Sequence, residues 1–160
     1  MDPTLAHALR ALLAAQEIAS LGTLRGDEPH VSMVPFALLP REPAFVIHVS
    51  GLAAHTRHML EHPKVSLLVM APQDGGTEPQ ALARVTIQGD AELLDPSGPG
   101  HGPARAAYLA RFPKSAGMFE LGDFALFAIR PRSLRFVGGF AQAKTVTPDG
   151  LRQALGAAGP

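Results

Sequence analysis

Two extended segments separated by a very short turn constrain the fold of this chain more than any other feature. Residues 18–25 and 31–39 carry the β-branched and apolar side chains of strands, and the turn between them is Arg25-Gly26-Asp27-Glu28. A turn this short joins antiparallel strands, because parallel strands need a crossover of about a dozen residues or more. The segment therefore predicts a β-hairpin.

The rest of the chain continues in short extended segments with helices between them. Strands are predicted at residues 45–50, 65–70, 83–94, 124–129 and 134–137, and helices after Pro3, at residues 53–61 and 104–112, and after Pro148. No Gly-x-Gly-x-x-Gly turn follows a strand, so a doubly wound nucleotide-binding sheet fits the sequence less well. We predict a mainly β fold, an antiparallel barrel of about six strands with peripheral helices.

Composition narrows the class of protein. The 160 residues suit one domain, placed at residues 1–148, with a short C-terminal helix or tail at 149–160. The chain has no cysteine, which excludes disulfides and thiolate metal sites and fits a reducing compartment. Basic and acidic residues balance at 14 each, so nucleic acid is a poor partner. No signal peptide or membrane-spanning segment is recognisable, so we expect a cytoplasmic protein without membrane contact.

One segment, Ser-Gly-Leu-Ala-Ala-His-Thr-Arg-His at residues 50–58, passes from a strand to a helix through a glycine. The first N–H groups of a helix have no intrahelical partner and carry the positive end of its dipole, so a phosphate is stabilised there. Ser50 and Thr56 add hydroxyl groups, while His55 and Arg57 add donors or positive charge. An ordinary helix start with a solvated polar face explains the same residues equally well.

A second polar feature lies on the long predicted strand at residues 83–94. Arg84, Thr86 and Gln88 share one face of this strand, and that face needs water, a partner or a ligand. Arg84 is suited to clamp a phosphate with two hydrogen bonds if it reaches the helix start, although an ordinary exposed arginine is the alternative.

Histidines at positions 55, 58 and 62 have helical spacing, so one helix face can present two imidazoles. No glutamate follows in the metalloprotease arrangement, and we predict no metal site. The chain also lacks a Gly-x-Ser-x-Gly elbow and a Walker loop, the usual carriers of acyl transfer and nucleotide hydrolysis.

Several motifs follow one another in an order known from one family. They lie at residues 21–24, 29–35, 50–57, 63–69, 83–89, 108–113, 123–124 and 138–140. The most specific are Leu-Ala-x-His-Thr at 52–56 and Ala-Arg-x-Thr-x-x-Gly at 83–89. On these motifs the chain resembles the pyridoxamine-phosphate-oxidase-like FMN-binding split barrels, in the branch that includes haem-utilisation oxygenases. The resemblance implies a six-stranded antiparallel split β-barrel.

The resemblance also implies FMN as cofactor and a homodimer with the flavin between its subunits. Together with the anion-site argument, it gives these cofactor-binding residues: Ser32, Met33, Val34, Ser50, His55, Thr56, Arg57, Arg84, Thr86 and Gln88. Ser50, His55, Thr56 and Arg84 are expected around the phosphate. Ser32, Met33 and Val34 are expected beside the isoalloxazine ring.

The implied function is that of an FMN-dependent oxidoreductase with an unassigned small-molecule substrate or electron donor. A flavin-binding sensor without turnover is one alternative. Haem binding or degradation is another, with His48, His55 or His101 as candidate iron ligands. Haem-degrading members of the family carry a further C-terminal region that helps to ligate iron, whereas this sequence stops at Pro160. Residues 138–144 also depart from the family pattern, because Ala141-Gln142 stands where a basic residue is common.

Overall fold

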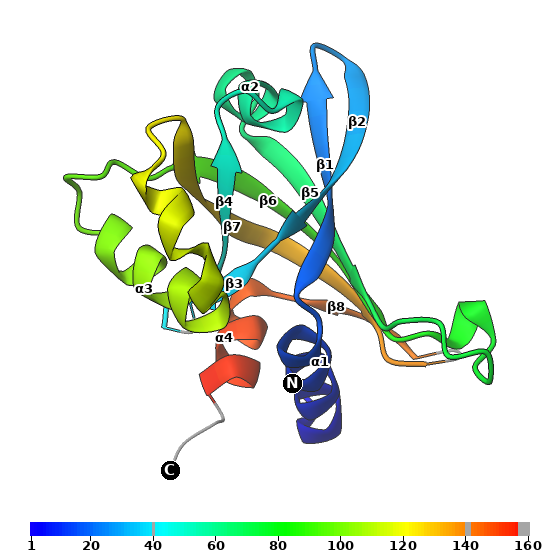
Figure 1. Ribbon diagram of the computed structural model, residues 1–160. Coiled ribbons are helices and arrows are strands. Elements are labelled where there is room, and N and C mark those ends of the chain that lie inside the picture. Colours follow the sequence, from blue (N-terminus) through cyan, green and yellow to red (C-terminus); the bar gives the residue numbers. More distant parts are fainter. Residues whose placement is uncertain (40, 140–141, 157–160) are drawn as a thin grey trace.

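The computed structural model describes residues 1–39, 41–139 and 142–156. Its main element is one antiparallel sheet that curls into a half barrel, with helices at its ends and along one side (Figure 1). The strand order is β2-β1-β5-β6-β7-β4-β3, and β8 pairs with β7. The predicted mainly β split barrel with peripheral helices is therefore confirmed, although the sheet has eight strands instead of about six.

The elements have the following bounds. The strands are β1 (Ile18–Arg25), β2 (Glu28–Pro35), β3 (Ala37–Leu39), β4 (Ala44–Ser50), β5 (Lys64–Met70), β6 (Arg84–Leu93), β7 (Phe124–Val137) and β8 (Ala143–Val146). The helices are α1 (Pro3–Ala15), α2 (Ala54–Glu61), α3 (His101–Arg111) and α4 (Pro148–Gly156), with 3-10 segments η1 (Pro79–Ala81) and η2 (Pro113–Glu120). No helix in the described ranges is long and apolar enough to cross a membrane.

The strands predicted at residues 124–129 and 134–137 are in fact one continuous strand, β7. A proline inside a strand lacks the N–H donor of a ladder hydrogen bond, and this segment contains Pro131. The structure places Pro131 at a β-bulge, where Gly89 pairs with Pro131 and Gln88 already pairs with Ser133. Arg132 is the extra residue of this bulge, so the ladder tolerates the proline and continues.

The concave face of the sheet forms the main core, which α1 and α4 close. Asp2 caps α1 by accepting hydrogen bonds from the amides of Thr4 and Leu5 at 2.8 and 3.1 Å, as the Asp-Pro start predicts. Three leucines of α1 enter the core: Leu9, Leu12 and Leu13. Helix α4 adds Leu151 and Ala154 to the same core, and residues 157–160 lie outside the described residues.

A second, smaller core lies on the convex side of β4 and β7, beneath α3. Arg111 at the end of α3 connects this layer to α1. Its guanidinium donates to the carbonyl oxygens of Leu13 and Ala14 at 3.2 and 3.3 Å and to that of Gln16. It also lies 5.0 Å from the centre of the Phe36 ring. Arg111 therefore satisfies carbonyl groups that the end of α1 leaves without helical partners.

Candidate functional site

The strand-to-helix turn brings together residues that are far apart in the sequence. Strand β4 ends at Ser50, and α2 begins at Ala54 without a side-chain hydrogen bond to its first amides. Beside this helix start, the Ser32 hydroxyl of β2 lies 3.0 Å from Nδ1 of His55. Two of the predicted cofactor residues thus meet next to unpaired helix amides, an arrangement suited to an anion.

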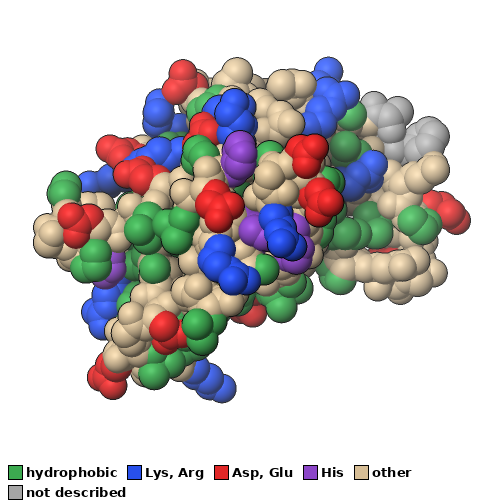
Figure 2. All heavy atoms as spheres, turned by 90° about the horizontal axis from the view of Figure 1, so that it is seen from above, with side chains coloured by type: hydrophobic (Ala, Val, Ile, Leu, Met, Phe, Trp, Pro, Cys, Tyr) green, Lys and Arg blue, Asp and Glu red, His purple; other side chains and the backbone are tan. Residues whose placement is uncertain are grey.

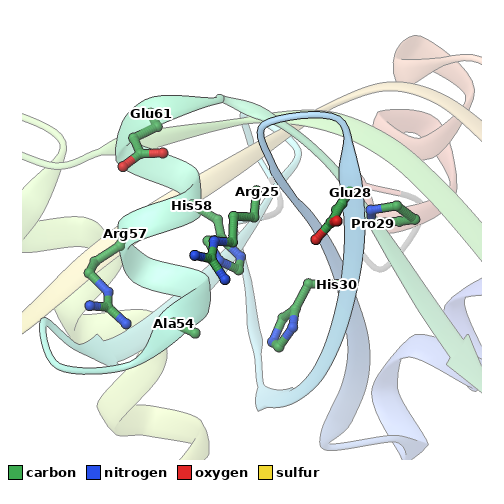
Figure 3. Close-up of a pocket in the computed structure, with 8 residues that line it drawn as sticks. All are labelled: Arg25, Glu28, Pro29, His30, Ala54, Arg57, His58 and Glu61. Carbon is green, nitrogen blue, oxygen red and sulfur yellow. The ribbon is translucent and has the colours of Figure 1, made fainter.

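A cavity of about 480 Å³ lies between α2 and the β1–β2 hairpin. Its lining residues are Arg25, Glu28, Pro29, His30, Ala54, Arg57, His58 and Glu61. Figure 3 shows His30 directed from the hairpin toward α2, with His58 and Arg25 between helix and strand. From above, histidines lie among acidic and basic side chains on this face (Figure 2). Four of the lining side chains are charged: Arg25, Glu28, Arg57 and Glu61. None of the four takes part in a salt bridge of the described residues, so all four are available to a ligand.

His58 forms the floor of this cavity. Its side chain is 7% exposed, and its Nδ1 lies 2.8 Å from the hydroxyl oxygen of the buried Thr23. The His30 ring stands edge-on to it, with 5.0 Å between the ring centres. Burial, with the added influence of His30 and His58, lowers the pKa of His55. At neutral pH His55 is therefore uncharged, and a bound anion would favour its protonation.

Ser50 and Thr56 stabilise the turn itself. The Ser50 hydroxyl donates to the Asp123 carboxylate at 2.9 Å and accepts the Leu52 amide at 3.1 Å. The buried Thr56 hydroxyl donates to the Ser50 carbonyl oxygen at 2.6 Å. Because a carboxylate lies against Ser50, an anion is better placed on the Ser32–His55 side of the helix start.

Arg84 does not reach the helix start within one protomer. Arg84 pairs with Met70, the last residue of β5. Strand β5 begins at Lys64, just after α2 ends, and Met70 lies roughly 20 Å from Lys64 along this strand. Its guanidinium donates to the carbonyl oxygens of Gln80 and Leu82 at 3.1 and 3.0 Å. The expected convergence of Arg84 and His55 on one phosphate therefore requires residues from a second copy of the chain.

The remaining predicted residues divide between the two faces of the sheet. Val34 is only 2% exposed and its side chain belongs to the main core, which leaves its backbone as the part of this residue near the surface of β2. Met33, Thr86 and Gln88 are exposed on the convex face, in rows that run from β2 across β1 and β5 to β6. The predicted residues thus lie on two surfaces of one protomer. One is the α2 junction, formed by Ser32 of β2, Ser50 at the end of β4 and the first turn of α2 with His55 and Thr56, and the other is the convex face.

The sequence interpretation missed three residues that shape the α2 junction: Thr23, His30 and Asp123. A signal existed for His30, because it precedes Ser32 by two positions on a strand and so shares its face. His58 follows His55 by three positions on a helix and was considered only as a metal ligand. The described residues contain no group of three side chains suited to hold a metal ion.

The three candidate iron ligands lie in different places. His48 is 6% exposed, and Phe119 stacks on its ring with 3.8 Å between ring centres, which leaves no room for a haem plane. His101 lines a separate cavity of about 760 Å³ beside the start of α3. Only His55 lies at the α2 junction. Phe140 and Ala141, of the segment that departs from the family pattern, lie outside the described residues.

Comparisons with known proteins identify relatives of this chain. The chain is 38% identical over 115 residues to the non-canonical heme oxygenase HOZ, chloroplastic, of Arabidopsis thaliana, covering 72% of this chain and 33% of that protein. It is 28% identical over 124 residues to heme oxygenase HutZ of Vibrio cholerae, covering 77% and 69%. A heme binding protein from Mycobacterium smegmatis has a similar structure, with a TM-score of 0.82, 31% identity and coverage of 95% and 61%.

The chain thus spans a third of the first relative's length and about three fifths of the mycobacterial protein's. The family model described as pyridoxamine 5'-phosphate oxidase matches residues 5–138, which include the whole half barrel up to the end of β7. The motifs around the strand-to-helix turn and along β6 fall within this range. The chain therefore belongs to the pyridoxamine 5'-phosphate oxidase family.

Proposed function

We propose that this protein binds FMN with the phosphate at the α2 junction and acts as a flavin-dependent oxidoreductase. The observation that carries the proposal is the Ser32–His55 contact beside the uncapped start of α2. These groups offer a hydroxyl, an imidazole and free helix amides to one anion. Family membership supports a flavin ligand in the same region.

The residues of this chain would hold and orient the cofactor. Ser32 and His55 would bind the phosphate, and Arg57 at the rim of the cavity would add a positive charge. His55 would take up a proton as the dianion binds, because the anion offsets the influences that lower its pKa. When bound, the flavin supplies hydride or electron transfer, and its substrate would enter beside the ring.

We further propose that the site is completed in a homodimer. On the convex face of the sheet, Val31 is 70% exposed, Met33 60% and Ile18 53%, values that favour burial against a partner. Arg84, Thr86 and Gln88 belong to the same side of the sheet. A second copy packed there would bring its polar strand face toward the ligand of the first copy. One protomer alone does not place these polar side chains at its own ligand site.

The oligomer is tested by light scattering of two charge variants. Met33→Glu places a carboxylate on the convex face and should convert the dimer to monomer at micromolar concentration. Leu60→Glu is the matched control, since Leu60 is 59% exposed but lies on α2. A wild-type protein that is monomeric and still binds FMN fully would contradict the dimer.

The ligand is tested by comparing FMN and riboflavin, which differ by the phosphate. His55→Ala should weaken FMN binding by about 1 to 2 kcal/mol, roughly 5- to 30-fold, because one hydrogen bond to a charged group is lost. Riboflavin affinity should not change. His62→Ala, an exposed histidine at the other end of α2, is the control. Equal affinity of the wild type for FMN and riboflavin would refute the phosphate site.

Haem is the second candidate ligand, because the relatives named above are described as heme oxygenases or a heme binding protein. His55 is the candidate iron ligand that lies at the α2 junction. A hemin titration monitored in the Soret region distinguishes the candidates. If haem is the ligand, the wild type and His62→Ala should show a saturable shift of the Soret band, and His55→Ala should not. The wild type should also bind FMN no more tightly than riboflavin.

A further inference from the structure

A buried histidine on the convex side of β4 is sealed by a short segment. His48 is 6% exposed, and Phe119 of η2 stacks on it with ring centres 3.8 Å apart and planes 7° apart. Tyr108 of α3 meets the same ring edge-on, with centres 5.7 Å apart, and Phe124 at the start of β7 lies at 5.2 Å. Phe119 therefore anchors η2 on this imidazole, and it also contacts Tyr108, with ring centres 6.1 Å apart.

This imidazole is the only buried side-chain group in the described residues that lacks a hydrogen-bond partner, and the orphan atom is Nδ1. A neutral ring tolerates this when Nδ1 is the acceptor nitrogen, whereas a protonated ring has two N–H groups that must both be satisfied. Burial, and secondarily His101, lowers the pKa of His48. The closed structure thus favours the neutral ring.

The charged and titratable groups near this aromatic cluster offer no rescue to a protonated ring. Helix α3 contributes His101 and Arg105, and the Arg105 guanidinium lies 5.0 Å from the Phe119 ring centre. Helix α3 also contributes the Tyr108 phenol, whose pKa is raised by burial. Glu120 ends η2 with an exposed side chain, and the Asp123 carboxylate accepts the Ser50 hydroxyl. None of them is hydrogen-bonded to Nδ1.

The sealing segment is connected to the strand-to-helix turn. Asp123, four residues after Phe119, accepts the Gly51 amide with its carbonyl oxygen and the Ser50 hydroxyl with its carboxylate. A side chain added at Gly51 would lie 3.1 Å from the same carbonyl oxygen, so the two backbones are in close contact. Segment η2 and the turn that begins α2 are therefore linked through Asp123.

We propose that His48 is a pH-dependent latch: its neutral ring keeps η2 closed, and its protonation opens η2 and frees the Ser50–Gly51 turn from Asp123. This inference goes beyond the proposed cofactor and holds whichever ligand binds at the α2 junction. A folded-state pKa below the ordinary value of about 6.5 means that the open state binds the proton more tightly. The closed state is therefore favoured above that pH. Below pH 6.5, the equilibrium constant for closing decreases by up to about tenfold per pH unit, until the pH is below the pKa of His48 in the closed state.

The chain contains a built-in probe for this latch. It has one tyrosine and no tryptophan, and that tyrosine is Tyr108 in contact with His48. We would measure tyrosine fluorescence of the full chain from pH 8 to pH 5. Amide exchange of residues 50–53 and 113–123 would be measured in parallel and corrected for the intrinsic pH dependence. Wild-type protein should show one fluorescence transition below pH 6.5, with protection lost in both segments together.

His48→Phe removes the titrating group while retaining a flat ring, and its fluorescence and exchange should not change over this range. His48→Leu serves the same purpose if the phenylalanine variant does not fold. His101→Asn should keep the transition and move it to higher pH, because in the wild type the positive charge of His101 opposes protonation of His48. His62→Asn, at an exposed position, should behave as wild type.

Two results would overturn the latch. One is a wild-type transition that persists unchanged in the His48 variants. The other is loss of protection at residues 113–123 while residues 50–53 stay protected, which would remove the connection through Asp123. Neither result bears on FMN binding, so the latch and the proposed cofactor fail or succeed separately.

Discussion

Replacement of Thr23 by valine tests whether the floor of the cavity is held by a single hydrogen bond. Valine has almost the shape of threonine, so Thr23→Val replaces only the hydroxyl that lies 2.8 Å from Nδ1 of His58. Thr23 is 2% exposed and His58 7%, so water cannot readily replace the lost partner. A buried polar group left without a partner costs about 1 to 3 kcal/mol. We expect about 2 kcal/mol of destabilisation, or about 4 to 8 °C in Tm for a chain of this size.

The assay is denaturant unfolding of four proteins that form a double-mutant cycle: wild type, Thr23→Val, His58→Phe and the double variant. A direct hydrogen bond should give a coupling energy of about 1 kcal/mol or more, because the second substitution costs less once the first partner is gone. Thr23→Ser keeps the hydroxyl and loses only a methyl group, so it should retain the coupling. Single-mutant effects that add to within about 0.3 kcal/mol would refute the reasoning.

Three further predictions follow from other contacts. Arg111→Ala should lower the free energy of unfolding by about 2 to 3 kcal/mol, because carbonyl groups at the end of α1 lose a charged donor; chemical denaturation measures it. Gly89→Ala should cost about 1 to 3 kcal/mol, since its Cβ would lie 2.5 Å from the Arg130 carbonyl oxygen. The control, Gly102→Ala in α3, meets nothing within 4 Å and should not destabilise the protein. The lowered pKa of His55 means that folding disfavours its protonated form, so its contribution to stability is complete above pH 6.5 and declines below; Tm measured against pH should show a smaller decline in His55→Ala.

The helix start and most strands were predicted from the sequence, because interactions between residues close in the chain determine them. Asp2 and Pro3 started a helix, and alternating side chains marked the strands. Two strands were predicted where the structure has one at residues 124–137, and a proline inside a strand normally interrupts it. Only the pairing of Gln88 and Gly89 with β7 shows that Pro131 lies at a bulge, and that pairing is a tertiary fact.

The start of α2 was predicted from one continuous segment, whereas the contacts that this segment makes across the fold were not predicted. Residues 50–57 were identified as a helix start near an anion, and the structure does leave the first amides of α2 without side-chain partners. The contacts of Ser32 with His55 and of Thr23 with His58 join distant segments, so no local pattern indicates them. Arg84 was assigned to the phosphate from the resemblance, and strand register places it at the far end of the sheet.

The position of β7 in the sheet has a consequence for how the chain folds during synthesis. This strand pairs with β6, β4 and β8, and its pairing joins Phe45 to Ile129 across about half of the sequence. Contacts between such distant residues slow folding, because a long loop must close before they form. Until residues 124–137 leave the ribosome, the facing edges of β4 and β6 have no partner strand. Unpaired edges bind other chains, so nascent protein interrupted before Phe124 should aggregate or recruit chaperones, whereas completion of β7 closes the half barrel.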